Sequence, residues 1–354
     1  MIVRFRLPFL LLAALSLIVG LWSGLQRIGW DLNILQASMH HGAIMVGGFL
    51  GTLISLEKIL PLKHKGLFAI PAMSAAGMVF FLLGYPIVAW SCLLLASMGL
   101  SVAFLHYFLR EKSLVYLLML GGGISWLIGN IVLITDRFYP LALPWWLGFA
   151  LLVITSERVE LTKFLPVTRT MKHLLVVLLA LYIVGPALSF HGTGSFVSGG
   201  ALVGVSAWLM RFDLIGISIH REGLTRFVAI ALLCGYISML LTGILILSLD
   251  SQPMAYDGVV HVFFIGFVFS MIFAHGPIIL PGVLGISAKP YHQFLYVWLA
   301  TLHASWLMRI TADLLLDLNM RKYSGILTTI AIIGYFATIA ILTAKNLHKH
   351  AKIL

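Results

Sequence analysis

Long apolar runs recur along the whole chain, and they restrict its fold more than any other feature. Each run has about 17 to 25 residues, and short polar segments separate one run from the next. An α-helix rises 1.5 Å per residue, so about 20 apolar residues cross the roughly 30 Å hydrocarbon core of a bilayer. Because a chain in lipid must satisfy its own main-chain hydrogen bonds, such runs form helices. We therefore expect an all-α, polytopic membrane protein.

The runs predict twelve transmembrane helices within a single transmembrane domain over residues 1–354. Composition agrees, since 61% of the residues are hydrophobic and only 10% are charged, against about 25% charged in soluble domains. The two cysteines lie in separate apolar runs, which argues against a thiolate metal site or a disulfide framework. The expected spans lie near residues 7–26, 38–57, 67–85, 88–109, 114–134, 140–157, 172–190, 195–211, 227–248, 256–276, 292–315 and 324–344.

The basic residues predict the orientation of these spans. Eighteen of the 23 lysines and arginines fall in alternate loops or at the termini. Basic residues concentrate on the cytoplasmic side of membrane proteins, so both termini should be cytoplasmic. This asymmetry explains the net charge of +11 without an anionic partner such as nucleic acid. The expected partner is the lipid bilayer.

Two histidines in separate spans are expected at one depth. With this topology, His41 in the second span and His261 in the tenth lie about one turn below the outer surface. Two imidazoles at one level can hold a haem iron between them, and Asp257 is placed to accept the second N–H of His261. The alternative is that each histidine bonds only to a neighbouring helix. His40 is a second candidate beside His41.

For the other polar residues inside the expected spans, a structural role is favoured over a functional one. His303 and Arg309 lie deep in the eleventh span, where an Arg309–Asp313 pair is favoured over a proton or anion path. His275 lies at a proline-broken helix end. The Gly47–Gly51 pair indicates close helix packing, or alternatively room for a flat cofactor.

The order of these motifs resembles the NnrS family of bacterial haem- and copper-containing membrane proteins, which is similar to subunit I of haem–copper oxidases. Residues 39–49 are similar to the family pattern W-H-x-H-E-M-x-x-G-F, and residues 261–271 match its H-x4-G-x4-M spacing. Segment 156–169 and Gly235-Tyr236 match further motifs loosely. The matching residues in the second and tenth spans are His41, Met45, Gly48, Phe49, His261, Gly266 and Met271.

The resemblance implies an oxidase subunit I-like bundle that binds haem, expected to be b-type. His41 and His261 would be the iron ligands, with Met45, Gly48 and Gly266 as further cofactor-binding residues. The sixth span has no histidine and the seventh has no His-His pair, where oxidases bind copper, so a copper site and oxygen reduction are not expected. The implied role is electron transfer, with a redox partner or quinol, or the handling of nitric oxide and nitrosative stress. The implied location is the bacterial inner membrane.

A transporter of a small solute, without cofactor, is the alternative function. Twelve spans with both termini inside suit a transporter, and Gly121-Gly122-Gly123 could unwind a helix at mid-membrane. The two halves of the sequence show no repeat, which argues against this alternative. The residues leave open a third possibility, an assembly subunit without cofactor.

Overall fold

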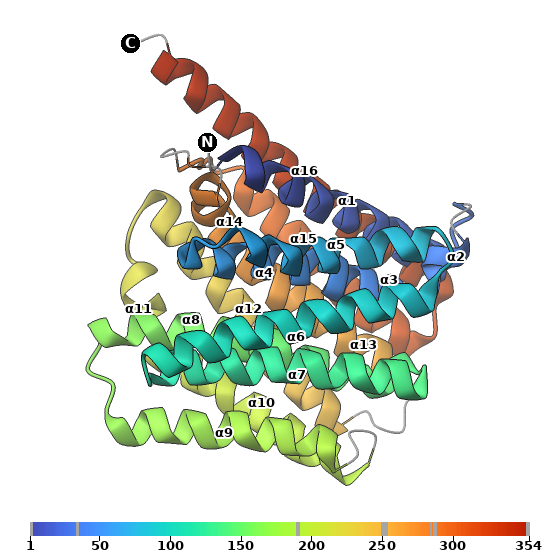
Figure 1. The fold of residues 1–354 in the computed structure, drawn as a ribbon, viewed down its shortest axis with the longest axis horizontal. Coiled ribbons are helices and arrows are strands. Elements are labelled where there is room, and N and C mark those ends of the chain that lie inside the picture. Colours follow the sequence, from blue (N-terminus) through green and yellow to red (C-terminus); the bar gives the residue numbers. More distant parts are fainter. Residues whose placement is uncertain are drawn as a thin grey trace. The chain divides into compact units, whose positions relative to one another are not determined.

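The computed structural model describes residues 3–32, 35–188, 192–248, 254–283, 285 and 289–351 (Figure 1). Within these ranges every regular element is a helix. Eleven helical segments there are long and apolar enough to cross a membrane, so the expected all-α, multi-span architecture is confirmed. The expected end of the seventh span, at residue 190, lies outside the described residues.

One of the twelve expected spans is a helix of lower mean hydropathy and is not among these eleven segments. The expected eleventh span forms a helix, α15 (Leu295–Leu315), of 21 residues. His303, Arg309 and Asp313 lower its mean hydropathy, and Arg309 and Asp313 are nevertheless buried. The structure therefore differs from the prediction at this segment, because the predicted count rested on length and position more than on the polar residues inside the run.

The chain divides into two compact units, which are described separately. Unit 1 is Met1–Val159 and unit 2 is Glu160–Leu354. The prediction of one transmembrane domain over the whole chain stays a prediction. The helices of unit 1 are α1 (Val3–Arg27), α2 (Leu35–Ser38), α3 (His41–Ala43), η1 (Ile44–Gly51), α4 (Thr52–Ile59), η2 (Leu60–Leu62), η3 (Lys65–Phe68), α5 (Ala69–Leu82), α6 (Pro86–Arg110), α7 (Leu114–Asp136) and α8 (Tyr139–Leu161), whose last two residues belong to unit 2.

Unit 2 continues from the end of α8. The expected tenth span is built from three successive elements, α13, η5 and α14, without a break between them. The helices of unit 2 are η4 (Thr162–Phe164), α9 (Arg169–Ala187), α10 (Thr193–Phe212), α11 (Ile215–Ser218), α12 (Gly223–Ser248), α13 (Ala255–His261), η5 (Val262–Val268), α14 (Phe269–Val283), α15 and α16 (Leu318–Ala351).

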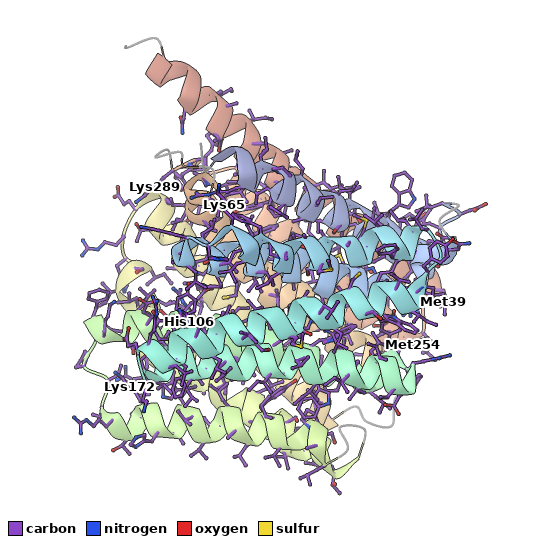
Figure 2. All side chains as sticks on the ribbon, viewed as in Figure 1. Met39, Lys65, His106, Lys172, Met254 and Lys289 are labelled. Carbon is purple, nitrogen blue, oxygen red and sulfur yellow. The ribbon has the colours of Figure 1, made fainter. Side chains whose placement is uncertain are left out.

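Sequential long helices in unit 1 pack side by side. Helices α5, α6 and α7 are neighbours in this order, and α1 packs against η1 (Figure 1). Met39 lies at one end of the unit, and Lys65 and His106 lie toward the opposite end (Figure 2). Asn130 joins three helices in the interior: its side-chain N–H donates to the Leu93 carbonyl, and its oxygen accepts from Trp146 Nε1. Antiparallel neighbours with short connections are typical of helical bundles.

Two of the spans contain a π-helical segment. Helix η1 interrupts the second span after His41, and helix η5 interrupts the tenth span directly after His261. π-Helical turns are rare and occur frequently at functional sites, because the wider turn displaces side chains and frees main-chain carbonyls. The second-span and tenth-span motifs, residues 39–49 and 261–271, lie in or beside these two segments.

Glycines in unit 1 serve close packing. A Cβ at Gly47 would lie 2.5 Å from Leu93 Cδ2, and one at Gly51 would lie 2.6 Å from the Trp126 ring. Protein side chains therefore fill the space beside both glycines, as the packing interpretation predicts. Gly121, Gly122 and Gly123 lie within the continuous helix α7. The expectation that they unwind a helix, which favoured a transporter, is wrong, because Gly122 instead lets α7 approach the Phe149 carbonyl of α8.

Candidate functional site

His41 is held by the neighbouring helix α1. Its Nδ1 lies 2.7 Å from the main-chain carbonyl of Gly20. A carbonyl oxygen only accepts, so Nδ1 carries the hydrogen and the lone pair of the neutral ring is on Nε2. This is the tautomer in which a histidine binds a metal through Nε2 while a main-chain carbonyl fixes the ring.

Two glycines of α1 make room for the residues of the second-span motif. A Cβ at Gly24 would lie 2.8 Å from His41 Cε1, and one at Gly20 would lie 2.3 Å from Met45 Sδ. A Cβ at either position would force its neighbour to move, which is easier for the flexible Met45 side chain than for the His41 ring, held by the Gly20 carbonyl. Gly20 and Gly24 were not among the residues predicted for the site, although their four-residue spacing on one helix face is visible in the sequence.

His40 is held in an aromatic box that is separate from the surroundings of His41. Its Nδ1 lies 2.6 Å from the Tyr139 hydroxyl, which also accepts a hydrogen bond from Trp90 Nε1 at 3.2 Å. The ring stacks on Phe81 with 4.5 Å between centroids. His40 precedes the helical span, and burial, followed by the Arg27 charge, lowers the pKa of its imidazole below the ordinary value. The two adjacent histidines therefore point to different partners.

His261 in unit 2 is held by its own helix. Its Nδ1 donates to the Asp257 carbonyl at 2.8 Å and lies 3.4 Å from the Asp257 carboxylate. This is the partner that the sequence predicted for the second ring N–H. The lone pair of the neutral ring is again on Nε2. The same tautomer is therefore present at both predicted iron ligands.

Asp257 also anchors a network of buried charges. Arg309 donates to both of its carboxylate oxygens, at 2.8 Å and 3.1 Å, and Arg321 Nη2 lies 2.8 Å from Oδ1. Asp313 lies 3.9 Å from Arg309 Nε and 3.2 Å from Arg321 Nε. The predicted Arg309–Asp313 pair is present, but Asp257 is the closer partner of Arg309. Its separation of 52 residues along the chain hid this bidentate pair from sequence analysis.

The remaining predicted cofactor contacts lie between helices. A Cβ at Gly48 would meet Met78 and Ser16 at 3.2 Å, and one at Gly266 would meet Ser238 Cβ at 2.6 Å. Met271 packs against Gly235 of α12, so two motifs of the resemblance touch one another in unit 2. The positions of Met45, Gly48 and Gly266 are thus known, and their role toward a cofactor stays a prediction.

His303 and His275 differ in how they are bonded. His303 accepts a hydrogen bond at Nδ1 from Trp306 Nε1, 2.9 Å away, and its Nε2 lies 3.0 Å from Ser270 Oγ. Both nitrogens are therefore used inside unit 2, as a structural histidine requires. His275 Nδ1 donates to the Met271 carbonyl at 2.7 Å, which repeats the anchor of His261 on the same span.

Each predicted iron ligand, taken by itself within its own unit, offers a ring nitrogen of the kind that binds a haem iron. Among the residues that the structure describes, no group of three or more His, Cys, Asp and Glu side chains gathers where it could hold a metal ion. His41 and His261 each donate Nδ1–H to a main-chain carbonyl, so in a neutral ring Nε2 is the nitrogen that can bind a metal.

Comparison with known proteins places the chain in a family. No curated protein and no solved structure matches it. One family model matches residues 6–344, and its description is a domain of unknown function, DUF8744. The match covers the described spans except the first residues of α1 and the last residues of α16. The chain therefore belongs to the DUF8744 family.

Proposed function

We propose that this chain is a haem-binding integral membrane protein with an oxidase subunit I-like bundle, related to the NnrS proteins. His41 and His261 hold the iron, and Met45, Gly48 and Gly266 belong to the surrounding shell. The observation that carries the proposal is the shared anchor of the two rings: in each, Nδ1 donates to a main-chain carbonyl, 2.7 Å or 2.8 Å away, at the start of a π-helical segment.

The surrounding residues suit a redox role. A bound haem supplies one-electron chemistry or, when an axial ligand is exchangeable, a position for a gas. Asp257 holds the His261 ring by its carbonyl and brings a carboxylate within 3.4 Å, which raises the basicity of an imidazole ligand. Arg309 and Arg321 balance the charge of Asp257. These contacts support a role in electron transfer from a redox partner or quinol, or in the handling of nitric oxide. The apolar spans and the distribution of basic residues support a location in a bacterial inner membrane with both termini cytoplasmic.

Absorption spectra of the purified protein test the proposal. Protein from haem-replete cells should show a Soret band, and His41→Ala and His261→Ala should each lose most of it. His275→Ala is the matched control, because His275 lies on the same span with the same type of anchor. A wild-type protein without a Soret band contradicts the proposal, and so does a spectrum that His261→Ala leaves unchanged.

The response to gas separates the two haem roles. A reduced haem that keeps both histidine ligands binds carbon monoxide and nitric oxide poorly. This result would favour electron transfer. A rapid spectral change with nitric oxide, together with loss of one histidine ligand, favours nitric oxide handling. Neither outcome alters the assignment of the iron ligands.

A solute transporter is the second candidate function. The division of the chain into two compact units at Val159 favours it, because many transporters are built from two helical halves. Uptake of a solute into proteoliposomes by haem-free protein would favour this function over the first. An uptake that His41→Ala and His261→Ala leave unchanged would show that the histidines are structural.

A further inference from the structure

Among the residues of unit 1 that the structure describes, four buried hydroxyl or indole groups have no hydrogen-bond partner within the chain. They are Thr52 Oγ1 and Ser55 Oγ of α4, Trp126 Nε1 of α7 and Thr155 Oγ1 of α8. All four residues are fully buried. A buried polar group without a partner costs about 1–3 kcal/mol, and proteins commonly avoid this cost with internal water. Four such groups within the six spans of unit 1 indicate that water molecules are bound in its interior.

Other buried hydroxyls in the same unit bond within their own helix. Ser97 Oγ donates to the Leu94 carbonyl and Ser101 Oγ to the Ser97 carbonyl, both at 2.8 Å. Thr52 and Ser55 follow the π-helix η1, and the carbonyls four residues before them belong to Gly48 and Gly51 inside it. A π-helix has a wider turn than an α-helix, so its carbonyls are shifted from the positions that a regular α-helix gives them. The hydroxyls are therefore left for another partner.

Three of the four groups, Thr52, Ser55 and Thr155, lie on a pair of parallel segments, the second span and α8. The contacts His40–Tyr139 and Lys58–Glu157 both join residues 99 positions apart. The second span and α8 therefore run in the same direction and in register from one end to the other. Between these two contacts, Gly51 lies against the Trp126 ring, which stacks on Phe149 with 4.8 Å between centroids.

A partly exposed charge cluster ends this polar column. Lys58 Nζ lies 2.5 Å from Glu157 and 3.0 Å from Glu57, and the two carboxylate side chains are 26% and 28% exposed. Ser55 is one turn before Lys58 on the same helix face. The register of 99 residues places Thr155 of α8 at the level of residue 56, next to the level of Ser55. Seven residues separate Gly51 from Lys58, so the column is about 10 Å long. At an oxygen–oxygen spacing of about 2.8 Å, it spans about four water molecules.

We propose that a file of buried water molecules follows Thr155, Ser55 and Thr52 from the Glu57–Lys58–Glu157 cluster to Trp126 and carries protons to the middle of unit 1. The three hydroxyls accept from and donate to the water, and the Trp126 indole N–H donates to the last molecule of the file. The charge cluster connects the file to the aqueous side that the basic residues assign to the cytoplasm. The proposal does not depend on a bound haem.

Deuterium exchange at tryptophan indoles tests the proposal. Protein labelled with ¹⁵N-tryptophan, in detergent micelles, gives one indole signal for each of the nine tryptophans, and Trp126→Phe identifies the signal of Trp126. Trp146 is the matched control, since it is also buried but donates to Asn130. A bonded, buried N–H exchanges only through local opening, so Trp126 should exchange at least about tenfold faster than Trp146. It should also show a nuclear Overhauser effect to water.

A double variant tests the path itself. Thr52→Val with Ser55→Ala removes two hydroxyls at nearly constant volume and should slow the exchange of Trp126 at least about tenfold, to the rate of local opening. Ser97→Ala removes a buried hydroxyl that is already bonded and should leave the rate unchanged. Unchanged exchange at Trp146 shows that the variants remain folded. The proposal is overturned if wild-type Trp126 exchanges as slowly as Trp146, or if the double variant exchanges as fast as the wild type.

Discussion

The two predicted iron ligands reach the same tautomer by different means. His261 donates to the carbonyl of Asp257, four residues earlier on its own helix. His41 donates to the carbonyl of Gly20, which belongs to a different span. The ring of His261 is therefore oriented by local helix geometry, whereas the ring of His41 depends on the packing of α1 against the second span.

Their surroundings differ in the same sense. His261 lies beside a network of two aspartates and two arginines, so its unit depends on balanced buried charge. His41 lies against two glycines, so its unit depends on the absence of side-chain atoms. A change of charge should accordingly damage unit 2 most, and a change of volume should damage unit 1 most. The predictions below test this contrast.

Loss of the central carboxylate should have the largest effect. Asp257→Ala removes the closest carboxylate partner of Arg309 and Arg321. It leaves two arginines beside Asp313, which is 3.9 Å from Arg309 Nε, and Arg309 is only 6% exposed. Removing one partner of a buried ion pair costs about 3–5 kcal/mol, because an uncompensated charge stays buried. We expect a large loss of thermal stability in detergent, measured by intrinsic fluorescence. Asp136→Asn changes an exposed aspartate and should have little effect. A stable Asp257→Ala variant would show that the network carries little of the stability of unit 2.

Addition of one methyl group beside each histidine should reduce stability and haem content more in unit 1 than in unit 2. Gly24→Ala places Cβ 2.8 Å from His41 Cε1, so the ring must move, at a cost of about 1–3 kcal/mol. Gly258→Ala is the matched change beside His261, where the nearest atom, Asp313 Oδ2, is 3.9 Å away. We expect it to be neutral or slightly stabilising. Haem content per protein and unfolding temperature measure both effects, and equal losses in the two variants would refute the contrast.

The sequence predicted the helices well because apolar run length is a local property. Eleven expected spans are present within the described residues, and the expected partner of the His261 ring was right because it is only four positions away. Partners distant along the chain were not predictable. Arg309 pairs with Asp257 and His40 with Tyr139, and periodicity carries no information about either contact.

Two further features could not be read from the sequence. The π-helical segments η1 and η5 have apolar sequences that are equally compatible with regular α-helix, so their wider turns emerge from packing. Trp145 and Trp146 follow Pro144 near the start of the sixth span, a position typical of the aromatic belt at a membrane interface, but Trp146 is 1% exposed and donates to Asn130. A tryptophan near the end of a span has the same pattern in either role, and only its neighbours decide between them.

The smallest expected effect distinguishes His40 from His41 within unit 1. Tyr139→Phe removes the hydroxyl that bonds to His40 Nδ1 and accepts from Trp90 Nε1. The loss should cost about 1 kcal/mol, because the stacking of His40 on Phe81 remains. If His41 is the iron ligand, haem content and the Soret maximum should stay unchanged in this variant, whereas Gly24→Ala alters both. If Tyr139→Phe shifts the spectrum and Gly24→Ala does not, the ligand in unit 1 is His40, and the aromatic box, rather than the glycine pair of α1, orients it.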